Sequence, residues 1–180
     1  GQTLAEAVVL KVRMQGKNTA VTLDREIPQI TLGSGRENFP KLEVTQIYNL
    51  SRSCNNFAFR NNAFVRGRRT GLLAKSGPGL IENNEFRELG GGGVELYNAP
   101  FEGLYAHDVL IQNNRFIENG VAWRERCSWP AIWSAVFGGK SPQPLHRNIR
   151  ILNNEFIDCA GPALHMADVE KLVRVLHRLV

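Results

Sequence analysis

The sequence has few cysteines and no long apolar run. Its 180 residues include three cysteines, Cys54, Cys127 and Cys159. An odd number at wide spacing fits neither a disulfide framework nor a zinc motif, and Cys159 is expected to be a small core residue because it follows an apolar run. No apolar stretch is long enough to cross a bilayer as a helix. We therefore expect no membrane partner, no metal and no other cofactor.

A strong excess of one charge is also missing. The net charge is +5, with 43% hydrophobic and 22% charged residues, which is ordinary for a globular protein. The basic residues are scattered apart from two groups, at residues 66–69 and 171–178. A nucleic-acid-binding face concentrates its basic residues and interleaves them with aromatics. We therefore expect no nucleic-acid partner.

No secretory signal opens the chain, because Gly1-Gln2-Thr3 carries no basic region. We expect the chain to be a processed product or a fragment, so this absence does not indicate a cytoplasmic location. The sequence predicts no particular oligomeric state.

What the sequence does contain is an internal repeat. Residues 57–64, 79–86, 109–116 and 149–156 share the template apolar, any, apolar, any, Asn, Asn, any, Phe, and only Gly79 breaks an apolar position. The asparagine pairs are 22, 30 and 40 residues apart. Growth by loop insertion at a constant strand pattern is typical of solenoids.

Each part of the template has a physical role. Alternating apolar residues predict a short strand with one buried face. Asparagine tolerates the left-handed backbone region, so the pair turns the chain, and stacked asparagines form hydrogen-bonded ladders. The phenylalanine returns to the core, and a second strand follows at 71–75, 93–97, 131–135 and 163–167. The pattern predicts an all-β fold, a right-handed parallel β-helix (a solenoid), either whole or a fragment of a longer one. Two columns are expected to stack: Phe64, Phe86, Phe116 and Phe156, and Ile81, Ile111 and Ile151.

The flanks of the repeat are less regular. We expect the coils to span 45–180 and an irregular β segment, with strands at 7–14 and within 19–33, to fill 1–44. The tail at 169–180 has two interpretations. Its apolar residues have helical spacing, which predicts a capping helix, yet His177 and Arg178 can replace the asparagine pair in a degenerate last coil. We favour the coil and keep the helix as the alternative.

Residues 45–168 resemble the right-handed parallel β-helix proteins of the pectin-lyase-like superfamily. Residues 59–73 with 81–86 are similar to the family 110 glycoside hydrolases, which are α-galactosidases, where an asparagine-rich turn precedes an arginine-rich corner and a Gly-Leu-Leu strand. That family often has arginine where Thr70 stands, and Glu102-Gly103 is similar to an acidic loop there. The resemblance implies a carbohydrate-active protein in an extracellular or periplasmic location, with an oligosaccharide or polysaccharide as its partner.

The second strand of each coil carries the candidate site. If Leu72, Val94, Ile132 and Leu164 point inward, the next position points outward. That outward row is Leu73, Glu95, Trp133 and His165, followed two residues on by Lys75, Tyr97, Ala135 and Ala167. Adjacent coils lie about 4.8 Å apart, so each row should stack. An aromatic ring beside ionisable groups is suited to binding a sugar and moving a proton.

The insertions at 98–108, 121–130 and 136–147 should wall this face into a groove. All three tryptophans lie between residues 123 and 133, and His146 lies in the last insertion. We take Glu95 and Glu102 as the candidate catalytic pair. The residues assigned to substrate binding are Tyr97, Trp133, His165, Arg68, Arg69 and Asp108.

Each candidate also has a structural interpretation. Glu95 and His165 are compatible with solvated surface positions, and Trp133 with packing under the loop at 121–130. The remaining alternatives are carbonyl binding at a corner for Arg68 and Arg69, bracing of its loop for Glu102, and closure of the turn before the next strand for Asp108.

Three function classes stay open. A glycoside hydrolase needs two carboxyl groups about 6.5–9.5 Å apart for inversion or about 5–5.5 Å apart for retention. Asp108 or Glu125 would substitute if Glu95 and Glu102 do not meet this requirement. A polysaccharide lyase needs a base beside a charge neutraliser, often calcium. A non-catalytic carbohydrate-binding or structural solenoid needs only the aromatic residues.

Overall fold

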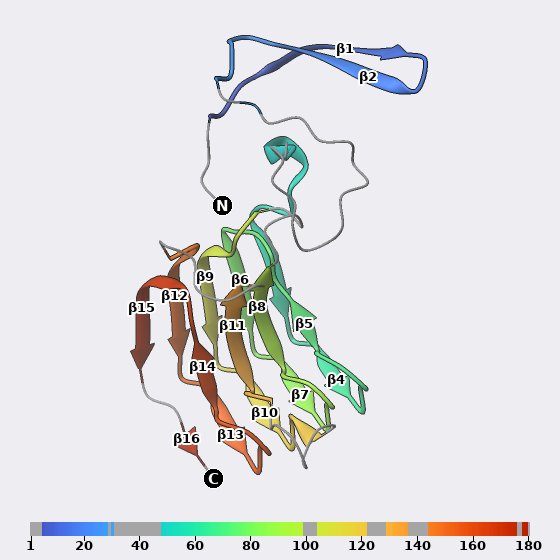
Figure 1. The fold of residues 1–180 in the computed structure, drawn as a ribbon. Coiled ribbons are helices and arrows are strands. Elements are labelled where there is room, and N and C mark those ends of the chain that lie inside the picture. Colours follow the sequence, from blue (N-terminus) through green and yellow to red (C-terminus); the bar gives the residue numbers. More distant parts are fainter. Residues whose placement is uncertain are drawn as a thin grey trace. The chain divides into compact units, whose positions relative to one another are not determined.

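The structure is a computed structural model that describes residues 5–28, 30, 48–98, 104–121, 129–136, 144–175 and 178–179. The chain divides into two compact units, Gly1–Ile47 and Tyr48–Val180 (Figure 1). The described residues form no helix with the length and hydropathy needed to cross a membrane.

The first unit contains an antiparallel hairpin of β1 (Val9–Gln15) and β2 (Asn18–Leu23). Gly16 has a φ of 62° in the connecting turn, which glycine adopts without the steric penalty of a side chain. Both predicted strands are present, but the second ends at Leu23. Ile30 lies outside any strand, and the rest of the strand expected after Pro28 lies outside the described residues.

The second unit consists of three parallel sheets, and successive strands along the chain join the three sheets in turn (Figure 1). The first sheet contains β3 (Phe57–Arg60), β6 (Gly79–Glu82), β9 (His107–Gln112), β12 (His146–Leu152) and β15 (Val169–Val175). The second contains β4 (Ala63–Val65), β7 (Glu85–Arg87), β10 (Arg115–Ile117), β13 (Glu155–Ile157) and β16 (Arg178–Leu179). The third contains β5 (Leu72–Leu73), β8 (Val94–Asn98), β11 (Ile132–Val136) and β14 (Leu164–Met166). A short 3-10 helix, η1 (Leu50–Arg52), precedes β3. The predicted all-β class with parallel sheets is confirmed.

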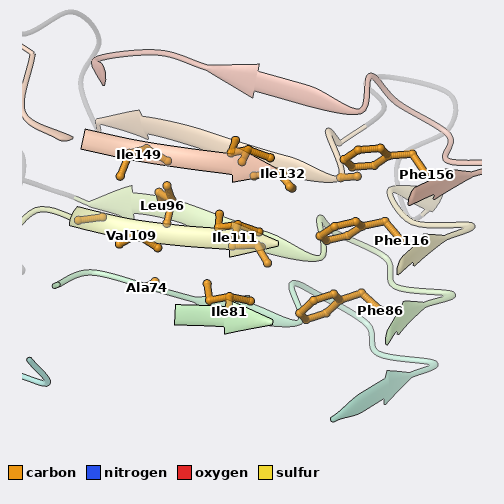
Figure 2. Packing of buried hydrophobic residues seen from close by; sticks show 14 of the residues in the cluster. Ala74, Ile81, Phe86, Leu96, Val109, Ile111, Phe116, Ile132, Ile149 and Phe156 are labelled. Carbon is orange, nitrogen blue, oxygen red and sulfur yellow. The ribbon is translucent and has the colours of Figure 1, made fainter. Parts of the chain in front are cut away.

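The two predicted columns run through the core of this unit. Phe86 and Phe116 are 0% exposed, and their ring centroids are 5.1 Å apart, as are those of Phe116 and Phe156. Phe64 continues the column on the other side of Phe86 at 5.6 Å. Ile111 pairs in register with Ile81 on one side and Ile151 on the other. Figure 2 shows the phenylalanines of three coils one above another beside the isoleucines, so both stacking predictions are confirmed.

The two asparagines of each pair have different roles. The first member always has a positive φ, from 51° to 57°, and therefore turns the chain between the first and second sheets. The second member points inward and builds a ladder between coils. Asn84 Nδ2 donates to Asn114 Oδ1 at 3.0 Å, and Asn114 Nδ2 donates to Asn154 Oδ1 at 3.0 Å. These amides are 1–2% exposed, so the ladder satisfies polar groups that would otherwise be buried without partners.

Gly79 breaks the template for a steric reason. It pairs in register with Phe57, whose ring lies against the position that a side chain would occupy. A Cβ at Gly79 would lie 2.1 Å from Phe57 Cζ, so no larger residue fits there without a shift.

The C-terminal tail forms strands. The residues of β15 pair in parallel with β12, and those of β16 pair with β13. The helical spacing of the apolar residues therefore does not produce a helix at 169–175, and the chain instead adds a strand to the first sheet.

Candidate functional site

The outward row of the third sheet stacks in register. Glu95 pairs with Leu73 on one side and with Trp133 on the other, and Trp133 pairs with His165. The neighbouring inward residues Val94 and Ile132 are 0% exposed, whereas Glu95 and Trp133 are half-buried and His165 is exposed. The strand alternation therefore presents a carboxylate, an indole and an imidazole on three successive coils.

Two further aromatic rings accompany Trp133. The Tyr97 and Trp133 rings stack with centroids 5.2 Å apart and an interplanar angle of 15°. Trp129 meets Trp133 edge to face at 4.9 Å. Because Tyr97 pairs in register with Ala135, its ring reaches Trp133 diagonally over a small side chain. The result is a continuous aromatic surface beside Glu95.

The Glu95 carboxyl group is held by the corner of the preceding coil. Thr70 Oγ1 donates a hydrogen bond to Glu95 Oε1. Burial raises the pKa of Glu95 above its ordinary value, and this effect exceeds the lowering by the Thr70 hydrogen bond and by the charge of Arg69. The site thus contains a carboxyl group that keeps its proton more strongly than one in water does.

Arg68 and Arg69 lie at the exposed corner just before β5. The charge of Arg69 acts on Glu95, which associates one of the two predicted arginines with the site. No ion pair joins either arginine to another described residue. Their assignment to substrate binding stays a prediction.

Asp108 lies on the first sheet, in β9. Its Oδ1 accepts a hydrogen bond from Asn148 Nδ2 at 2.5 Å, and its Oδ2 lies 2.9 Å from His107 Nδ1. These contacts lower the pKa of Asp108. Asp108 has a φ of 51°, and Asn148 at the equivalent position of the next coil has a φ of 50°. The contacts of Asp108 favour the structural interpretation, in which it stabilises a left-handed turn at the start of the strand.

Several predicted site residues lie outside the described residues. They are Glu102, Trp123 and Glu125, with most of the three insertions. Residues 99–103 directly follow β8, and residues 137–143 directly follow β11. The separation of the Glu95 and Glu102 carboxyl groups therefore stays a prediction.

The sequence reasoning placed His146 in a wall of the groove, and the structure corrects this. His146 begins β12 and is 0% exposed. Its Nε2 donates to the Ala135 carbonyl oxygen at 3.3 Å, and its ring meets Tyr105 edge to face at 5.9 Å. Burial lowers its pKa. Strand alternation counted back from the buried Ile149 would point the His146 side chain outward. Asn148 has a φ of 50°, which interrupts the alternation, so the His146 side chain is buried instead.

A second feature is a hollow of about 540 Å³ at the first coil, lined mostly by apolar side chains. Phe59 and Leu72 line it and are half-buried, whereas their partners in the next coil, Ile81 and Val94, are 0% exposed. In the described residues, β3, β4 and β5 form the edges of their sheets. The hollow therefore lies at the end of the core that the described strands form, and most of the described side chains that line it are apolar.

The described residues contain no group of three His, Cys, Asp or Glu side chains that could hold a metal ion. The chain matches no protein-family model, and searches of curated proteins and of solved structures find no significant match.

Proposed function

We propose that Tyr48–Val180 forms a right-handed parallel β-helix of the pectin-lyase-like kind. Each strand pairs with the strand three positions further along the chain, so every connection returns to the same sheet in parallel. Such connections are right-handed in about 98% of cases. One asparagine turn and one corner with a positive φ recur in each of the four template coils, which supports the same assignment.

The outer face of the third sheet binds an oligosaccharide or polysaccharide in this proposal. The observation that carries it is the Glu95 carboxyl group beside the stacked Tyr97 and Trp133 rings. Sugar rings have apolar faces that pack on aromatic side chains, while their hydroxyl groups need polar partners. His165 and Arg69 lie on the same face or its corner and supply such partners.

The chemistry proposed is glycoside hydrolysis. Glu95 acts as the general acid, because its half-buried position favours the protonated form that must donate to the leaving oxygen. Glu102 acts as the second carboxylate, on the insertion that follows β8. The similarity of residues 59–73 with 81–86 to the family 110 glycoside hydrolases supports this reaction class and an extracellular or periplasmic location.

Product analysis tests the reaction class. The protein is incubated with a panel of oligosaccharides in water enriched in ¹⁸O, and the products are examined by mass spectrometry and ultraviolet absorption. Hydrolysis places one ¹⁸O atom in a new reducing end. An unsaturated product that absorbs in the ultraviolet would instead identify a polysaccharide lyase. Binding without cleavage would identify a carbohydrate-binding solenoid.

The Glu95→Gln variant tests the assigned acid. It keeps the shape of the side chain but removes the transferable proton, so turnover should fall by about 10²–10⁴ with substrate binding nearly retained. Glu170→Gln removes a carboxylate at an exposed position of β15 and is the matched control. Full turnover in Glu95→Gln would exclude Glu95 as the acid.

A further inference from the structure

We propose that Thr70 is a positioning residue for Glu95, because its hydroxyl holds Oε1 and leaves Oε2 as the oxygen that exchanges the proton. This inference rests on the proposed function of Glu95 as a general acid. Thr70 belongs to the corner of the first coil, and Glu95 belongs to the third-sheet strand of the second coil. The single hydrogen bond from Thr70 Oγ1 to Glu95 Oε1 therefore joins two coils.

Both residues are fixed by backbone hydrogen bonds on either side of this contact. Immediately after Thr70, the Gly71 N–H donates to the Gly92 carbonyl oxygen at 3.1 Å and the Leu72 N–H donates to that of Gly93 at 2.9 Å. The Ala74 N–H donates to the Glu95 carbonyl oxygen at 2.9 Å. The hydroxyl and the carboxyl group are thus placed by a rigid parallel ladder, which is what a precise site requires.

A glycine in the second coil makes room for Thr70. A Cβ at Gly91 would lie 3.0 Å from both the backbone N and Oγ1 of Thr70. The Gly91 N–H donates to the Arg69 carbonyl oxygen at 3.3 Å, so the two corners already lie in direct contact. Gly91 therefore allows the close approach that brings the Thr70 hydroxyl to Glu95.

The hydrogen bond is compatible with both protonation states of the acid. When the proton is on Oε2, Oε1 is a carbonyl oxygen and accepts from Thr70. During glycoside cleavage the Oε2–H bond breaks, the proton joins the leaving oxygen, and the bond from that oxygen to the anomeric carbon breaks. A water oxygen bonds to the anomeric carbon in its place, and its proton passes to the second carboxylate, which the proposed function assigns to Glu102. Glu95 becomes a carboxylate, and Thr70 still donates to Oε1. Because this bond is stronger to a carboxylate than to a neutral acid, Thr70 stabilises the state that forms during the proton transfer.

The test is a direct titration of Glu95, which needs no substrate. Glutamate carboxyl carbons are labelled with ¹³C, and the Glu95 signal is identified by its loss in Glu95→Gln. Thr70→Val removes the hydroxyl at nearly constant shape and should raise the pKa of Glu95 by about one unit, because a hydrogen bond to a charged group is lost. Thr70→Ser keeps the hydroxyl and should restore the pKa of the wild-type protein. An unchanged pKa in Thr70→Val, or no restoration by serine, would overturn the inference.

Gly91→Ala provides a second variant in case Thr70→Val does not fold. The added methyl group would lie 3.0 Å from both the backbone N and Oγ1 of Thr70, so the Thr70 corner must shift by a few tenths of an ångström. This shift weakens the hydrogen bond to Glu95, so the pKa of Glu95 should again rise, and an unchanged pKa would count against the inference. If the protein cleaves a glycan, Thr70→Val should also move the alkaline limb of the pH–rate profile to higher pH, with a larger effect on kcat than on KM. Failure of hydrolysis in the product analysis would overturn the proposed function, while the titration alone decides whether Thr70 controls Glu95.

Discussion

Glu95 links the chemistry of the site to the stability of the fold. Burial raises its pKa above the ordinary value of 4.5, so the folded state holds the proton at pH values where the unfolded chain has released it. A carboxyl group with a raised pKa makes folding less favourable as pH rises through that window. The free energy of unfolding of Glu95→Gln, relative to that of the wild-type protein, should therefore increase from about pH 4 to about pH 7. Denaturant unfolding at both pH values measures the difference.

Glu170→Gln controls for the removal of one negative charge from an exposed position. If Glu95→Gln lost stability relative to the wild-type protein over this pH range, the carboxyl group would be stabilised by its partners rather than penalised by burial.

His146 predicts a pH dependence of the opposite sign. Burial lowers its pKa from the ordinary value of 6.5, so the folded state favours the neutral imidazole. The unfolded chain takes up the proton first as pH falls, and the stability that depends on the neutral form is lost below about pH 6.5. His146→Phe should weaken the loss of stability between about pH 7.5 and about pH 5. Equal pH dependence in His146→Phe and the wild-type protein would contradict this prediction.

Side-chain directions could be predicted from the sequence within regular strands but not at the corners between them. Strand alternation from Val94 and Ile132 correctly placed Glu95 and Trp133 outward, because a side-chain period of two leaves no freedom within a strand. Thr70 was not found, since it lies at a corner where that alternation does not apply.

At the scale of the elements, substitutions at the two adjacent asparagines of one turn should have different effects on stability. Asn113 has a φ of 54°, which glycine adopts freely, so Asn113→Gly should change stability little. Asn114 Oδ1 accepts from the Asn84 N–H at 2.9 Å, and its Nδ2 donates to Asn154 Oδ1. Asn114→Ala leaves several buried groups without partners and should cost about 2 kcal/mol or more. Unfolding in urea compares the variants, and a larger loss in Asn113→Gly would reverse the assigned roles.

The phenylalanine column predicts a large packing effect. Phe116 is 0% exposed and stacks on a ring in each neighbouring coil, so Phe116→Ala should cost about 3–5 kcal/mol. Val65 on β4 is 47% exposed, and Val65→Ala should change stability by no more than about 0.5 kcal/mol. A loss below about 1 kcal/mol for Phe116→Ala would mean that the ring is not part of a packed core.

The elements were predictable where the repeat is complete. The four copies of the template each imply a strand, a turn and an inward phenylalanine, and the same contacts recur in every coil. The tail shows the limit of this reasoning, because its apolar spacing fits a helix and a strand equally well. The parallel pairing of β15 with β12 determines the outcome, and that contact is tertiary.

For the molecule as a whole, stacking of coils produces the core and the candidate site together. The pairing that buries Val94 against Ile132 also aligns Glu95 with Trp133 on the outside. This face could be predicted from the sequence, because the alternation within each repeated strand determines which side chains point into the core and which point outward. The predicted groove wall, formed by the three insertions, stays a prediction, because most of their residues lie outside the described residues.

The most direct measurement of the central claim is binding of the protein to a panel of immobilised oligosaccharides, compared for the wild-type protein, Trp133→Ala and Val65→Ala. A glycan groove on the third sheet predicts that the wild-type protein binds at least one oligosaccharide. Trp133→Ala should weaken that binding by about tenfold or more, because the stacked aromatic surface is lost. Val65→Ala, on the second sheet, should bind like the wild-type protein. Absence of oligosaccharide binding by the wild-type protein, or equal binding by Trp133→Ala, would contradict the assignment of this face.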